Sequence, residues 1–227
     1  RRSGPVGTRG RIVEVVGTLP IWPLLAVGLA WGVLADRLSA RWPAKEAGVR
    51  PPDWRTVAVA SASAAAAVAL GLRFGPDPAI GLVLAGYVAA LVVLLATDLD
   101  QRILPDVITL PLVGYVLLVD LAGANPFLGS FGLAGAIAAA VVYPSLLYLL
   151  SVPFGRGALG LGDVKLLVSV GLLLGLGRGL VAVFAAAIAA GVVIAALLAG
   201  GRISLRSYVP FGPFLIFGTL WAIVGPV

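Results

Sequence analysis

The chain has no cysteine, no histidine and no methionine among its 227 residues. The missing cysteines exclude disulfides and thiolate metal sites, and the missing histidines exclude the usual general base and the usual nitrogen ligand of zinc. Acid–base chemistry near neutral pH must therefore come from Asp, Glu, Lys, Tyr or water, and we expect no metal and no cofactor. Because methionine is absent, we also expect that Arg1 is not the translated start.

Charge is scarce as well. Charged residues make up 11% of the chain and hydrophobic residues 60%, with a mean hydropathy of +1.09. Since a soluble domain carries about a quarter of charged residues, this chain cannot cover a surface that faces water, and a lipid bilayer is its expected surrounding. The net charge of +6 comes from basic residues between apolar runs, as in cytoplasmic loops, so we expect no nucleic-acid partner.

Long apolar runs recur along the chain, and a helix needs about 20 such residues to cross the hydrocarbon core. They predict an all-α, polytopic transmembrane bundle of about eight helices, as one domain over 19–227 after a tail at 1–18. The sixth run is short, so a re-entrant segment is its alternative. The expected spans are 19–35, 56–72, 78–97, 104–121, 131–152, 164–177, 179–200 and 208–227.

The loops between these spans differ in charge from one side of the membrane to the other. One side carries most of the basic residues, including a short loop at 37–55, whereas the other carries Arg73 and Arg178 apart from the tail. The positive-inside rule places the richer side in the cytoplasm. The protein is thus predicted to be a multi-pass protein whose polar face points to the cytoplasm.

Most of the ten acidic residues lie in tails, in loops or at helix ends, where a solvated charge is the simplest interpretation. For Asp36, the neighbouring Arg37 predicts a local ion pair. Asp106 follows Pro105 and is a candidate cap for the next helix. The acids assigned to solvent or to the membrane interface are Glu14, Asp36, Glu46, Asp53, Asp77 and Asp120.

Two aspartates stand out by their position. Asp98 closes an apolar run, while Asp163 follows a glycine-dense segment and opens another run on the same predicted face. Ionisable groups at membrane depth are costly and are functional candidates. Two adjacent carboxyls can share a proton, so that one activates water and the other protonates the substrate. Helix capping is the simpler role for Asp163. The glycine-dense segment is not a phosphate-binding loop, because it lacks the Gly-Lys-Ser/Thr that such a loop needs.

Three segments carry a family resemblance: DLDQRILPD at 98–106, GLGDVK at 160–165 and YVPFGPF at 208–214. In this order they resemble the signature stretches of the type IV prepilin peptidases, which are membrane aspartic proteases of the GxGD type. The resemblance implies that Asp98 and Asp163 are the catalytic pair. The residues implied to support the motif or the substrate are Asp106, Gly160, Gly162, Lys165, Pro210, Gly212 and Pro213.

The resemblance also implies a function: removal of the basic leader from prepilin or pseudopilin precursors at the cytoplasmic face of the bacterial inner membrane. Asp100 and Asp106 would favour a basic leader there. Many family members carry a four-cysteine zinc insert after the first helix, linked to N-methylation of the product. Its absence here excludes zinc at that position and puts N-methylation in doubt. The alternative function, a small proton-coupled transporter or channel, predicts acids near the middle of the membrane.

Overall fold

A computed structural model describes residues 20–42, 50–152, 160–204 and 209–225. Within these ranges the chain is helical and contains no strand, which confirms the predicted all-α class. The predicted tail at 1–18 and the middle of the 37–55 loop lie outside the described residues. The helices are α1 (Ile21–Ser39), α2 (Trp54–Phe74), α3 (Pro78–Gln101), α4 (Asp106–Leu121), α5 (Gly132–Ser151), α6 (Leu161–Ala199) and α7 (Gly212–Val224).

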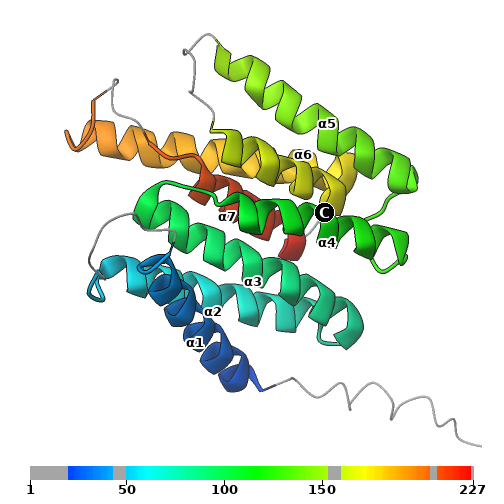
Figure 1. Ribbon diagram of the computed structural model, residues 1–227, viewed down its shortest axis with the longest axis horizontal. Helices are drawn as coiled ribbons and strands as arrows, with labels where there is room; N and C mark the ends of the chain where they lie inside the picture. Colours follow the sequence, from blue (N-terminus) through cyan, green and yellow to red (C-terminus); the bar gives the residue numbers. More distant parts are fainter. Residues whose placement is uncertain (1–19, 43–49, 153–159, 205–208, 226–227) are drawn as a thin grey trace, which may run out of the picture.

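The helices run back and forth through one bundle, as Figure 1 shows. Five of them, α1, α2, α3, α5 and α6, are long and apolar enough to cross a membrane, and α7 is a shorter apolar helix. Helix α4 has 16 residues and contains Pro111. The chain is therefore a multi-pass membrane bundle, as its composition predicted.

The prediction of two spans at 164–177 and 179–200 is close to the structure, because α6 consists of two helices joined across a kink. As one straight helix, its 39 residues would be about 58 Å long, far beyond the hydrocarbon thickness of about 30 Å. The stretch is broken at Gly175, whose φ of 61° and ψ of −167° are not helical, and its ribbon doubles back (Figure 1). The break thus falls slightly earlier than predicted and leaves no loop between the two parts.

Glycine explains why the break occurs at that point. A residue without Cβ adopts a positive φ at little steric cost. The hydroxyl of Tyr143 on α5 donates to the carbonyl oxygens of Gly175, at 3.4 Å, and of Leu176. Carbonyls that lose their helical partners at the break are therefore satisfied by a neighbouring helix.

Small residues let the helices approach each other closely. A Cβ added to Gly28 of α1 would lie 2.6 Å from the Cα of Ala64 on α2, and one added to Gly171 of α6 would lie 2.6 Å from the Cα of Ala140 on α5. Such contacts between backbones replace the hydrophobic driving force that is missing between helices in lipid. Alanines and glycines thus lie at the closest contacts between these helices.

The prediction of solvated charge is wrong for two of the six acids assigned to it. Asp36 is fully buried, although its predicted pair with Arg37 is present. Asp120 is 6% exposed and accepts a hydrogen bond from Asn125 at 2.6 Å. Both lie where other helices cover a helix end, which run lengths along the chain do not reveal.

The remaining acids of that set lie at helix starts or outside the described residues. Asp77 is exposed and accepts a hydrogen bond from the backbone N–H of Ile80, as the N-cap of α3. Asp53 is the N-cap of α2 and forms a capping box with Thr56. Glu14 and Glu46 fall outside the described residues.

Candidate active site

The two aspartates singled out by the sequence lie at the same end of the bundle. Asp98 is in the last turn of α3, and Asp163 is in the first turn of α6. Their exposed fractions are 5% and 6%, so both carboxyl groups are removed from bulk solvent. Figure 1 shows that the end of α3 and the starts of α6 and α7 lie toward one side of the molecule.

Gly212, the first residue of α7, shows how close the two carboxyl groups are. A Cβ built on this glycine would lie 3.0 Å from Cγ of Asp98 and 3.4 Å from Oδ1 of Asp163. The two carboxyl groups therefore border the same point, at the start of α7. A side chain at residue 212 would occupy the space that both acids share.

A small cavity of about 60 Å³ opens beside the aspartates. Its volume has room for water, and its walls supply the polar groups that a bound water needs. Backbone from three connections closes around it, because α3, α6 and α7 all end or begin there. The lining residues are Asp98, Arg102, Leu104, Gly160, Gly162, Asp163, Pro210 and Phe211.

Two features of this site are costly for the fold. Oδ2 of Asp98 is buried and has no hydrogen-bond partner among the described residues, although buried polar atoms are nearly always paired. Arg102, the C-cap of α3, has φ 57° and ψ 38° and is the one described residue other than glycine with a positive φ. Such strained positions cluster at functional sites.

The glycines of the GLGDVK segment allow close approach. Gly160 is the N-cap of α6 and lines the cavity. A Cβ on Gly162 would lie 2.7 Å from Cβ of Leu104, so a larger residue would push the start of α6 away from the segment that follows α3. Gly160 rather than Asp163 is the N-cap of α6. The carboxyl group of Asp163 accepts a hydrogen bond from the backbone N–H of Gly160 and also lines the cavity.

Other predicted motif residues lie around the cavity without lining it. Lys165 of α6 donates to Asp106 at 2.6 Å and so joins the starts of α6 and α4. Asp106 is the first residue of α4 and makes no capping hydrogen bond, so its predicted capping role is wrong. Pro213 lies in the first turn of α7, where proline is favoured.

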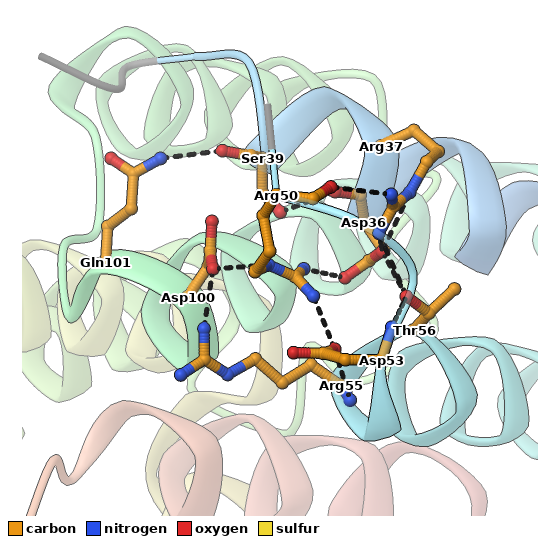
Figure 2. Close-up of polar contacts among 9 residues, drawn as sticks. All are labelled: Asp36, Arg37, Ser39, Arg50, Asp53, Arg55, Thr56, Asp100 and Gln101. Atoms are coloured by element: carbon orange, nitrogen blue, oxygen red, sulfur yellow. Dashed lines mark hydrogen bonds and ion pairs between the residues drawn. The ribbon is translucent and has the colours of Figure 1, made fainter. Parts of the chain in front are cut away.

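Sequence reasoning missed the partners of Asp100. Figure 2 shows Asp100 facing two arginines; its Oδ1 lies 2.7 Å from Nη1 of Arg55 and 2.8 Å from Nε of Arg50. The charges of Asp100 and Asp106 are thus already balanced by basic side chains of the same protein. The cluster of basic residues at 37–55 is the sequence signal for these pairs, because it supplies partners for nearby acids as well as the positive charge of a loop.

Comparisons with known proteins agree with the motifs. Residues 85–195 match the type IV leader peptidase family, a range that contains both aspartates and ends before the start of α7. The chain is 37% identical over 145 residues to a prepilin leader peptidase/N-methyltransferase of Burkholderia pseudomallei, covering 64% of this chain and 46% of that protein. It is 35% identical over 130 residues to the one of Aeromonas hydrophila, covering 55% and 43%.

The chain thus spans less than half the length of the curated relatives that it matches. No solved structure matches it.

Proposed function

We propose that this chain is a membrane aspartic endopeptidase of the type IV leader peptidase family, which its residues 85–195 match, and that it removes the leader from type IV pilin-like precursors. Asp98 and Asp163 are its catalytic pair. The observation that carries the proposal is the approach of both carboxyl groups to one point at Gly212. They come from helices far apart in the sequence and line one cavity.

The proposed chemistry needs these two groups and a water molecule. Carboxyl groups so close together do not both ionise easily, so they hold one proton between them. The ionised carboxylate takes a proton from water, whose oxygen attacks the scissile carbonyl, while the protonated partner donates to the carbonyl oxygen. Collapse of the tetrahedral intermediate transfers a proton to the leaving amine and returns the pair to its starting state.

The cytoplasmic orientation of this site is part of the proposal. The end of the bundle that carries Asp98 and Asp163 also carries the loops richest in arginine and lysine, and the positive-inside rule assigns such loops to the cytoplasm. A precursor anchored by its apolar helix in the inner membrane would present its leader at this face. In this orientation the polar cavity would meet the peptide bond where it leaves the lipid.

Removal of the leader is the whole of the proposed activity. The relatives' names include an N-methyltransferase, but this chain spans less than half of their length and has no cysteine for a zinc insert. We therefore do not extend methylation to it.

A proton-coupled transporter is the alternative function. It requires acids near the middle of the membrane, along a path that crosses it. Asp98 and Asp163 instead lie within one turn of a helix end. Their position supports hydrolysis at one face over transport.

Substitution of either aspartate tests the proposal. The Asp98→Asn and Asp163→Asn variants, in proteoliposomes with a pilin-like precursor, should lose cleavage by at least about 10²-fold, because each removes a proton-transfer group. Asp77→Asn is the matched control: it lies at the opposite end of α3, and asparagine caps a helix as well as aspartate. Normal cleavage by either active-site variant would refute the catalytic pair.

A further inference from the structure

A network of ion pairs and hydrogen bonds surrounds Asp100, two residues after Asp98 (Figure 2). It joins the end of α1, the start of α2 and the end of α3. It contains three aspartates and three arginines, so its charges balance. We call it the ion-pair network; its members are Asp36, Arg37, Ser39, Arg50, Asp53, Arg55, Thr56, Asp100 and Gln101.

Arg50 contacts all three carboxylates of this network. Its Nη2 lies 2.5 Å from Oδ1 of Asp36, its Nε lies 2.8 Å from Oδ1 of Asp100, and its Nη1 pairs with Asp53. Its side chain is 17% exposed and that of Asp36 is 1% exposed, so these charges are held away from water. A planar guanidinium with several donors can bind three acids at once, whereas a lysine ammonium cannot match this geometry.

The pKa of one carboxyl group of the network, which lies outside the bilayer-spanning helices, is lowered by this arrangement. Asp53 precedes α2, and desolvation would raise its pKa. Hydrogen bonds from the backbone of Arg55 and from Arg50 outweigh that effect and hold the pKa below its usual value. The contacts of Arg50 and Arg55 therefore favour the ionised form of Asp53.

The ion-pair network contacts one face of the last turn of α3, and the active site lies on the opposite face of this turn. Side chains two residues apart on a helix point about 200° away from each other. Asp98 lines the cavity near α6 and α7, and Asp100 points to Arg50 and the α1–α2 side. Nε2 of Gln101 also donates to the carbonyl oxygen of Ser39 at 2.6 Å.

We propose that Arg50 is a positioning residue of the active site: by binding Asp100, it holds the last turn of α3 so that Asp98 faces Asp163. The inference rests on the proposed function, because it concerns the geometry of the same two aspartates. Last turns of helices fray when nothing holds them. A displacement of about 1 Å at a reacting group can lower a rate by about 10²-fold.

The first test separates turnover from substrate binding. Arg50→Ala should lower kcat by roughly 10- to 100-fold and leave KM nearly unchanged, because Arg50 contacts no cavity-lining residue through its side chain. Arg50→Lys, which keeps the charge, should lie between this variant and the wild type. Unchanged kcat in Arg50→Ala, or a rise in KM alone, would overturn the inference.

A double-variant cycle tests whether Arg50 acts through Asp100. Arg50→Ala combined with Asp100→Ala should lower kcat by less than the product of the two single losses, since both variants remove the Arg50–Asp100 contact, although Asp100 also pairs with Arg55. Multiplied losses would show independent roles and would contradict the proposal. Arg41→Gln is the control: Arg41 is an exposed arginine just after α1 and is not a member of the ion-pair network, so kcat should stay near that of the wild type.

A third measurement does not depend on catalysis. The chain has no cysteine, so Asp98→Cys introduces a single thiol beside the cavity. Its labelling by a small maleimide should be several-fold faster when Arg50→Ala is also present, because the loosened turn exposes it. Equal labelling rates would overturn the positioning role even if the wild type cleaved no precursor. If the wild type cleaves the precursor and Arg50→Ala is fully active, the positioning role is refuted and the proposed peptidase function stands.

Discussion

The absence of a Cβ at Gly212 leaves room for both carboxyl groups of the candidate active site. A Cβ there would fall between the carboxyl groups of Asp98 and Asp163, and the position lies in the first turn of a helix, where alanine is otherwise the better helix former. The glycine is thus explained by the site it borders rather than by the helix it begins.

Gly212→Ala should therefore lower cleavage by about 10²-fold through displacement of a carboxyl group, while the thermal unfolding temperature stays the same or rises. The control is Gly114→Ala in α4, where a Cβ would meet nothing within 4 Å. Both quantities can be measured on detergent-purified protein. Full activity of Gly212→Ala would contradict the placement of the two acids around this residue.

Among the elements, α6 depends most on one backbone conformation. Its break at Gly175 lets a stretch of 39 residues double back within the bundle. Space does not require glycine there, because the nearest atom to an added Cβ is the carbonyl oxygen of Phe127 at 3.9 Å. The constraint is the positive φ with an extended ψ, a region that side chains strongly disfavour.

Gly175→Ala should accordingly reduce the free energy of unfolding by about 1–3 kcal/mol. Gly177→Ala is the control two residues away, with no positive φ and nothing within 4 Å of an added Cβ; it should be neutral or stabilising by up to about 1 kcal/mol. Thermal unfolding followed by circular dichroism compares the two. Equal stability of both variants would show that the break does not need glycine.

At the scale of the whole molecule, the separation of charge between the two ends of the bundle carries the proposed orientation. The end of α6 lies on the same side of the molecule as the end of α3, whereas the start of α5 lies on the other side (Figure 1). Arg202 follows α6, and the exposed turn residue Ser130 precedes α5. The lack of cysteine makes both positions suitable for single thiol reporters.

In intact spheroplasts, Ser130→Cys should react with a membrane-impermeant maleimide. Arg202→Cys should react only after the membrane has been permeabilised. The reason is the positive-inside rule applied to the two sets of loops. Cleavage activity retained by both variants would serve as the check on folding. The reverse labelling pattern would place the active site on the outer face and contradict the proposed cytoplasmic processing.

The sequence by itself determined the class of this protein, most of its helices and the location of Asp98 and Asp163 at one end of the bundle. These properties depend on run length, on charge between runs and on short motifs, all of which are local in the chain. The tertiary structure decided that both carboxyl groups meet at Gly212, that Asp36 and Asp120 are buried, and that Arg50 binds Asp100. Each of these requires contact between helices distant in the sequence, and such contacts arise from packing, which no local pattern encodes.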